Sequence, residues 1–231
     1  MTETRDSASN DVTDGSYVIY SKKDSSVSID AKNNIQLTLS SDKNDEQLVG
    51  IASNDSNIHL DAGNTITISL KAENSDRGSN IIGVLAKNNT SNEKDIIELT
   101  QTQTQGTADQ KAIYISAEGK TYNNVTAVKV ENSDFIASAA SGNITVRAIN
   151  HDRGVAYAVW LNGTDQSKIS TENGNILIAS TISKDSSYVG NSMGAWLQKN
   201  ATLHLEGSTI QFENSNSSQN SSGDAYSIRA D

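Results

Sequence analysis

The sequence predicts an all-β fold, a parallel β-helix (β-solenoid) with three short strands per coil, a period of about 33 residues and six to seven coils. Three observations support this fold class. Short segments that alternate apolar and polar residues recur along the chain, their starts are almost evenly spaced, and no run keeps a helical spacing beyond about one turn. Such a repeat is typical of a solenoid in which each coil packs on the next.

One segment type marks the length of each period. Its copies start near residues 35, 65, 111, 144, 176 and 209, which gives intervals of 30, 46, 33, 32 and 33 residues. The longest interval contains TQTQTQGTADQ, which we expect to form a loop insertion at about 100–110. Ankyrin and tetratricopeptide repeats have similar periods but consist of helices, whereas these segments have a two-residue periodicity and many β-branched residues. The period therefore indicates a β-solenoid.

A second segment type comes directly before each copy of the first and is separated from it by a short turn. Its clearest copies end in Gly-Asn or Gly-Ser and occupy residues 57–64, 134–143, 167–175 and 201–208. Glycine and asparagine tolerate the left-handed backbone conformation that a tight turn requires. Each coil is therefore expected to read strand, turn, strand, loop, strand, turn.

The third segment type follows a polar loop, and its copies show which positions face the core. The third position is apolar in every copy, so we expect it to point inward: Ile19, Ile51, Val84, Val128, Val159, Ala195 and Ile228. The second position is small in every copy: Val18, Gly50, Gly83, Ala127, Ala158, Gly194 and Ser227. Because side chains alternate along a strand, the second position is expected to point outward together with the fourth.

The repeat also predicts the domain organisation. Residues 1–13 are expected to be a disordered or artificial leader, and residues 14–231 a single β-helix with the insertion at about 100–110. Since the repeat begins and stops in mid-coil, we expect the chain to be a fragment of a longer rod, whose last coil would normally be capped or continued.

Composition excludes several classes of protein. The chain carries 18 basic and 28 acidic side chains, a net charge of −10, which argues against a nucleic-acid partner because phosphate binding needs a basic surface. It has no cysteine, so disulfides, thiolate metal sites and cysteine nucleophiles are excluded. It also has no proline, as expected where the N–H groups of each strand pair with a neighbouring coil. No apolar run approaches the roughly 20 residues that cross a bilayer.

At this level the sequence resembles the passenger domain of Gram-negative autotransporters. The resemblance covers essentially residues 17–231 and rests on the coils GNTITISL, GNITVRAI and GNILIAS, on the strands IGVLA, YAVWL and MGAWL, and on the lack of cysteine. Secreted adhesins of the filamentous-haemagglutinin type share this coil and remain an alternative. The resemblance implies a right-handed β-helix at the bacterial cell surface or outside the cell. It implies membrane contact only through a C-terminal barrel that lies outside this chain.

The fourth position of the third segment type carries the candidate ligand-binding residues. Its later copies hold Leu85, Lys129, Trp160, Trp196 and Arg229. Because equivalent strands stack about 4.8 Å apart, we expect the two indoles to be neighbours on one outward face with a cation on either side. Exposed rings of this kind would form a flat apolar platform for a sugar face or for side chains of a protein partner. Alternatively, the indoles stack only on each other or lie beneath a loop.

Two near-identical loops are secondary candidates. The sequence NSDRG contains Asp76 and Arg77, and NHDRG contains Asp152 and Arg153. Two coils would separate the carboxylates by about 9.6 Å, within the range of the acid pair of an inverting glycosidase. The adjacent arginine would keep each acid ionised, however, which is the wrong state for a general acid. A role in forming turns is therefore favoured over catalysis.

The insertion is the other loop candidate, with Gln101, Gln103 and Gln105 as possible contact residues. Its strict alternation predicts an exposed polar strand or hairpin that protrudes from the rod, although a disordered loop fits equally well. Loops carried on a rigid scaffold often bind partners.

No catalytic residue, metal site or cofactor is expected. His59 and His204 occupy equivalent positions four coils apart, about 19 Å, and so do not share a metal. The acidic loop at 41–47 lacks the ligand spacing of a calcium loop.

The functional expectation is a non-enzymatic adhesin segment. The resemblance implies binding to a protein or glycan on a host or bacterial surface or in the matrix, or self-association in a biofilm. A glycan-cleaving β-helix enzyme is the alternative from a different class.

Overall fold

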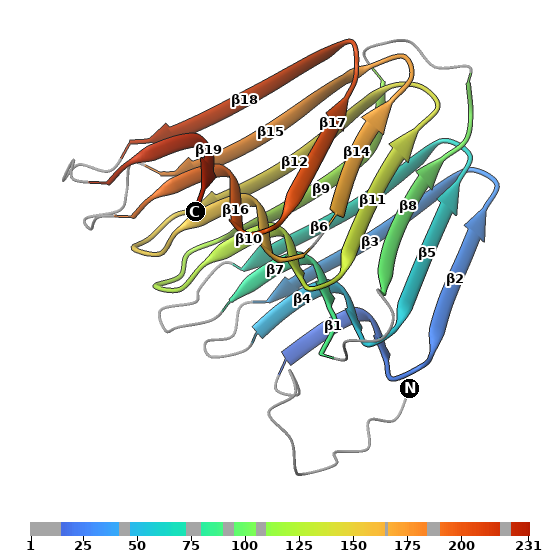
Figure 1. The fold of residues 1–231 in the computed structure, drawn as a ribbon, viewed down its shortest axis with the longest axis horizontal. Coiled ribbons are helices and arrows are strands. Elements are labelled where there is room, and N and C mark those ends of the chain that lie inside the picture. Colours follow the sequence, from blue (N-terminus) through green and yellow to red (C-terminus); the bar gives the residue numbers. More distant parts are fainter. Residues whose placement is uncertain are drawn as a thin grey trace.

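A computed structural model describes residues 15–41, 47–72, 80–89, 95–104, 110–164, 166–183, 190–217 and 223–231. These residues form a parallel β-solenoid of about six turns, in which three sheets run side by side along the stack (Figure 1). The coils follow one another in chain order, so the first strands lie at one end of the stack and the last strands at the other. The predicted fold class and three-strand coil are confirmed.

Sheet A contains the third segment type, with all neighbouring strands parallel. Its strands are β1 (Gly15–Lys22), β4 (Gln47–Asn54), β7 (Ile81–Lys87), β10 (Val125–Glu131), β13 (Ala156–Gly163), β16 (Ser192–Lys199) and β19 (Ala225–Ala230). Seven strands about 4.8 Å apart give this sheet a length of about 29 Å along the stack.

Sheets B and C contain the second and first segment types, respectively. Sheet B consists of β2 (Ser26–Ala31), β5 (Asn57–Ala62), β8 (Ile96–Gln101), β11 (Asp134–Ala139), β14 (Gln166–Thr171) and β17 (Thr202–Glu206). Sheet C consists of β3 (Asn34–Ser41), β6 (Thr65–Ala72), β9 (Lys111–Gly119), β12 (Asn143–Asn150), β15 (Asn175–Ile182) and β18 (Thr209–Asn216). Each segment type therefore forms a sheet of its own.

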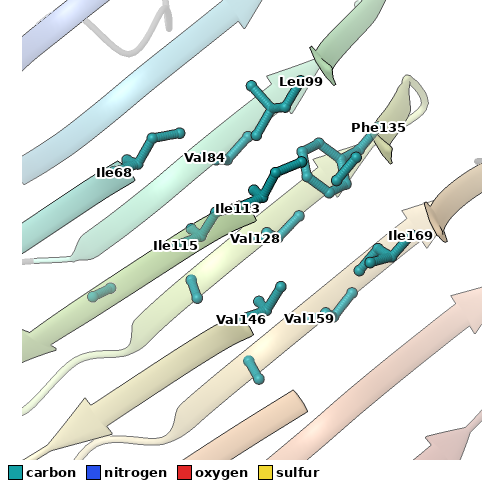
Figure 2. Close-up of a cluster of buried hydrophobic side chains, with 14 of the residues drawn as sticks. Ile68, Val84, Leu99, Ile113, Ile115, Val128, Phe135, Val146, Val159 and Ile169 are labelled. Atoms are coloured by element: carbon teal, nitrogen blue, oxygen red, sulfur yellow. The ribbon is translucent and has the colours of Figure 1, made fainter. Parts of the chain in front are cut away.

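The core is a column of apolar side chains enclosed by the three sheets. Figure 2 shows contributions from each sheet, such as Val128 from sheet A, Phe135 from sheet B and Ile115 from sheet C. Equivalent positions of successive coils lie in register, so that Ile115 pairs with Ile68 of the coil before it and with Val146 of the coil after it. Each fully buried aliphatic or aromatic side chain contributes about 1.5–3 kcal/mol to folding, and the repeat multiplies this contribution along the stack.

The corners between sheets A and B use residues that tolerate a left-handed backbone. Asp55 follows β4 with a φ of 55°, and Asn132 follows β10 with a φ of 52°. Asparagine and aspartate side chains then link successive coils, as where the Asn57 Oδ1 accepts a hydrogen bond of 2.9 Å from the Ile96 N–H. This turn chemistry explains why polar Asn- and Asp-rich loops separate the apolar segments.

The structure corrects one expectation about sheet A, namely the direction of the small second position. Ala127 and Ala158 are fully buried in the core, together with the third-position residues beside them. A Cβ added to Gly50 would lie 2.8 Å from the Leu70 Cδ1, an atom of the core. The second and third positions therefore both face inward, and the first and fourth both face outward.

A break in the pleat at the second position accounts for this difference. The residues on either side pair in register with the neighbouring strands, as for Thr126 with Tyr157 and Val128 with Val159, whereas the second position has no pair. The backbone at this position lies very close to the next strand. A Cβ added to Gly83, for example, would lie 2.5 Å from the Ala127 carbonyl oxygen. Small residues are therefore required at this position in successive coils.

Candidate functional site

The four charged and aromatic candidates form one column on the outer face of sheet A. Lys129 on β10 pairs in register with Trp160 on β13, Trp160 pairs with Trp196 on β16, and Trp196 pairs with Arg229 on β19. Both indoles are half-buried and lie outside the core cluster. The structure thus places the two tryptophans on adjacent coils of an outward face.

Tyr157 joins the two indoles and completes an aromatic stack of three residues, Tyr157, Trp160 and Trp196. The ring centroids of Tyr157 and Trp160 are 5.1 Å apart, those of Tyr157 and Trp196 5.3 Å, and those of the two indoles 5.3 Å. The ring planes lie within 30° of parallel, as in offset stacking. Such pairs add about 0.5–1.5 kcal/mol each beyond the apolar area they bury.

Sequence reasoning missed Tyr157 because strict alternation places residues three apart on opposite faces. The break at Ala158 moves the first and fourth positions to the same face, and Tyr157 then leans toward Trp160. The small residue at the second position of every copy was the available signal for this break. An invariably small residue marks close approach of the backbone more reliably than it marks an outward position.

Two cations cover the ends of the aromatic stack. The Lys129 Nζ lies over the Trp160 ring, 4.5 Å from its centroid, and the Arg229 Cζ lies 6.0 Å from the centroid of Trp196. Both are cation–π distances. The ring faces are therefore engaged by other rings or by cations, and a partner from solvent meets mainly the ring edges. This arrangement differs from the flat open platform expected from the sequence.

Acidic partners neutralise both cations and hold them in place. The Lys129 Nζ lies 2.9 Å from the Glu131 Oε1, and the Arg229 Nε lies 3.1 Å from the Asp231 Oδ2. Asp231 also accepts a hydrogen bond of 2.9 Å from the Trp196 Nε1. The hydrogen bonds from Trp196 and Arg229 lower the pKa of Asp231 below its usual value, so this carboxylate remains ionised at neutral pH.

The other indole N–H and the tyrosine hydroxyl differ in their surroundings. The Trp160 Nε1 donates a hydrogen bond of 3.0 Å to the Gln198 Oε1, which fixes the orientation of the indole. Burial raises the pKa of Tyr157 to about 12, although the positive charge of Arg229 acts in the opposite direction. The aromatic stack is therefore neutral at neutral pH and anchored by polar groups at its rim.

Leu85 occupies the same column but does not belong to the exposed surface. It is 4% exposed and packs with Val49, Ala52 and Ile82 in a separate apolar cluster on the outer side of sheet A. Lys129 lies between Leu85 and Trp160 in the register of the strands. Leu85 is thus separated from the aromatic stack by one coil.

The NHDRG loop has the geometry of a structural turn. Asp152 is 8% exposed, and its Oδ1 lies 3.9 Å from the Arg153 Nε. The buried Asn150 organises the loop, since its Oδ1 accepts hydrogen bonds from the N–H groups of Thr121 and Asp152. The equivalent pair, Asp76 and Arg77, lies outside the described residues, so the structure does not place the two carboxylates relative to each other.

The expectation of a protruding strand is wrong for Gln101, which is buried at the end of β8. Its amide donates hydrogen bonds of 2.9 Å to the carbonyl oxygens of Gly63 and Gln103 and accepts one from the Ser141 N–H. Gln101 therefore connects three successive coils. The side chain of Gln103 is exposed, and Gln105 lies outside the described residues.

Within the described ranges, no group of three His, Asp or Glu side chains has the geometry of a metal site. The histidines pair instead with single carboxylates, as where the His59 Nδ1 lies 3.1 Å from the Glu98 Oε2 on the next coil. The acidic loop at 42–46 is not among the described residues. In the same described part of the chain, no helix has the length and apolar character needed to cross a membrane.

Comparisons of the chain with protein-family models, with curated proteins and with solved structures gave no match. The fold alone defines the class of this protein, a parallel β-solenoid of about six turns.

Proposed function

We propose that the chain is a non-enzymatic binding rod, a segment of a bacterial cell-surface adhesin, and that its partner packs against the aromatic stack of sheet A. The contact of the half-buried Trp160 and Trp196 with each other and with the buried Tyr157 is the observation that carries this proposal. Large aromatic side chains gathered on an outer face are typical of protein interaction sites. The resemblance to autotransporter passenger domains supports a location on the bacterial surface.

The structure of the aromatic stack favours one kind of partner. Lys129 and Arg229 flank it, and the indoles stack on each other, so a sugar ring has little free indole face on which to lie. Ring edges, together with the stems of the two cations, suit the side chains of a protein surface. We therefore place a protein of the host cell, the matrix or another bacterium at this site.

The fold provides the mechanical basis for adhesion. Stacked coils form a rigid scaffold in which every strand of one coil pairs with the next, and no moving part is needed to present the aromatic stack. Adhesion through several copies on one cell gains strength from multivalency, so a modest affinity per site is sufficient.

The test measures binding of the fluorescently labelled chain to fixed epithelial cells and to a collagen–laminin matrix. The double variant Trp160→Ala/Trp196→Ala is compared with the control Tyr122→Ala, which removes an aromatic ring that is 43% exposed and outside the stack. Circular dichroism verifies that each variant keeps its β structure. We expect the double variant to lose at least about 10-fold in affinity, which corresponds to about 1.4 kcal/mol, and the control to bind like the parent.

Three results would overturn the proposal. Equal binding of all three proteins would exclude the aromatic stack as the contact. Tryptophan-dependent sedimentation of the chain as an oligomer, without binding to cells or matrix, would identify self-association instead. Polysaccharide cleavage that disappears in Asp76→Ala or Asp152→Ala would identify an enzyme.

A further inference from the structure

A groove lies on sheet C, away from the aromatic stack. It has a volume of about 680 Å³ and crosses the outer faces of β9, β12, β15 and β18. Tyr114, Thr145 and Leu177 pair in register across the first three of these strands. One position further along the face, Arg147 pairs with Ala179, and Ala179 pairs with Glu213. The groove thus combines apolar, cationic and hydroxyl-bearing side chains with one carboxylate, Glu213.

Arg147 is the unusual charge in this groove. It is exposed, and it has no ion pair with any carboxylate of the described residues. The other two described arginines do have carboxylate neighbours, Arg153 at 3.9 Å and Arg229 at 3.1 Å. Lys111 lines the same groove and places its Nζ 4.5 Å from the centroid of the Tyr114 ring. In a chain with a net charge of −10, this groove offers a cationic site that is open to an anion.

The fork of an arginine side chain matches a carboxylate. A free guanidinium forms two parallel hydrogen bonds with a carboxylate or a phosphate, and such charge-assisted bonds are roughly twice as strong as neutral ones. Glu213 on the far side of the groove is occupied in part by a 2.7 Å hydrogen bond from the Gln211 amide. Its negative charge disfavours a doubly charged phosphate more than a single carboxylate.

The remaining lining suits a sugar. Leu177 and Tyr114 are partly exposed; Lys111 lies over one face of the Tyr114 ring, so Leu177 and the rest of the Tyr114 ring offer apolar surface to the C–H groups of a pyranose ring. Thr145, Thr181 and Ser215 supply hydroxyl groups that both donate and accept hydrogen bonds with sugar hydroxyls. Because β9, β12 and β15 are each paired on both sides, this part of the groove offers no row of free backbone groups to an extended peptide.

We propose that this groove binds an acidic oligosaccharide, with the carboxylate of a uronic or sialic acid on Arg147 and its ring against Tyr114 and Leu177. The site is independent of the aromatic stack, since the two lie on different sheets. The chain would then contact a cell surface in two ways, through protein on sheet A and through acidic glycan on sheet C.

The experiment uses isothermal titration of the whole chain with hyaluronan hexasaccharide, with the fully N-acetylated and therefore neutral form of chitohexaose as the matched sugar and hexaglutamate as an acidic peptide. Arg147→Gln removes the proposed contact. Lys32→Gln makes the same charge change at an exposed lysine in the turn between β2 and β3 and serves as the control. A Trp160→Ala/Trp196→Ala protein tests independence from sheet A.

We expect hyaluronan hexasaccharide to bind at least about 10-fold more tightly than chitohexaose and hexaglutamate. Arg147→Gln should abolish this preference for the acidic sugar, whereas Lys32→Gln and the double tryptophan variant should retain it. The proposal is overturned if chitohexaose binds as well as hyaluronan, if hexaglutamate binds best, or if Lys32→Gln and Arg147→Gln weaken binding equally. The last result would mean that general charge, not the groove, attracts the sugar.

Discussion

Tyr157 and Trp196, on adjacent coils of sheet A, stack with their ring centroids 5.3 Å apart and their planes 12° from parallel. This contact exists because the pleat breaks at Ala158, which turns Tyr157 to the outer face. The tyrosine is 5% exposed, while the two indoles remain half-buried. Tyr157 therefore forms the base of the aromatic stack, and the indoles form its accessible edge.

The protonation of Tyr157 gives a first prediction. Its pKa is raised to about 12 by burial, above the value near 10 of a solvated tyrosine, so the folded state holds its proton more tightly than the unfolded chain. The stabilising contribution is complete below pH 10 and is lost as the pH rises toward 12. Ultraviolet titration of the parent and of Tyr157→Phe should show that the variant lacks one late-ionising phenol. If the phenol that is missing from Tyr157→Phe is instead one that titrates near pH 10 in the parent, Tyr157 is not in a buried environment.

The close approach at the second position of sheet A gives a second prediction. A methyl group on Gly83 would lie 2.5 Å from the Ala127 carbonyl oxygen and 3.0 Å from the Ile115 Cγ2, so Gly83→Ala must shift backbone atoms. We expect a loss of about 1–3 kcal/mol in the free energy of unfolding, measured by urea denaturation.

Gly207→Ala is the matched control for Gly83→Ala. Its methyl group would meet the Thr171 Cγ2 at 3.2 Å, a contact that a side-chain adjustment relieves, so its cost should be smaller. Equal costs at both glycines would argue against a specific requirement in sheet A.

Phe135 gives a third prediction, which concerns the core. Its side chain is fully buried and points from β11 into the interior beside residues of all three sheets (Figure 2). Phe135→Ala should lower the free energy of unfolding by about 3–5 kcal/mol, because the surrounding coils cannot close fully around the cavity that the substitution leaves. The midpoint of unfolding by circular dichroism measures this effect. The surface variant Tyr122→Ala removes only an exposed ring that contacts the Arg153 guanidinium and should stay within about 1 kcal/mol of the parent. A loss below about 1 kcal/mol for Phe135→Ala would show that this coil is not closely packed.

The sequence predicted the coil and the register of the tryptophans because both follow from local periodicity. The apolar ladder through Ile51, Val84 and Val128 and the stacking of Trp160 on Trp196 require only that equivalent positions align. The placement of Tyr157 could not be predicted, since it depends on a departure from two-residue alternation that arises where neighbouring backbones approach each other.

The site details that the sequence missed are contacts between coils. Gln101 resembles the exposed residues of a polar loop, yet it is buried by hydrogen bonds with groups of the coils before and after it. The unpaired state of Arg147 likewise depends on which acids the register places near it. Side chains that point outward are little constrained by the repeat, so their partners are visible only in the assembled stack.

Acrylamide quenching of tryptophan fluorescence tests most directly whether the indoles form an accessible surface. It is measured on Trp160→Phe and Trp196→Phe, each of which leaves one indole as the reporter, in the folded state and in urea. We predict that each remaining indole is quenched in the folded state with a constant well above zero but below its value in urea, as a half-buried ring requires. Blue-shifted emission with almost no quenching in both variants would place the indoles in a dry interior, and the aromatic stack would not be a binding surface.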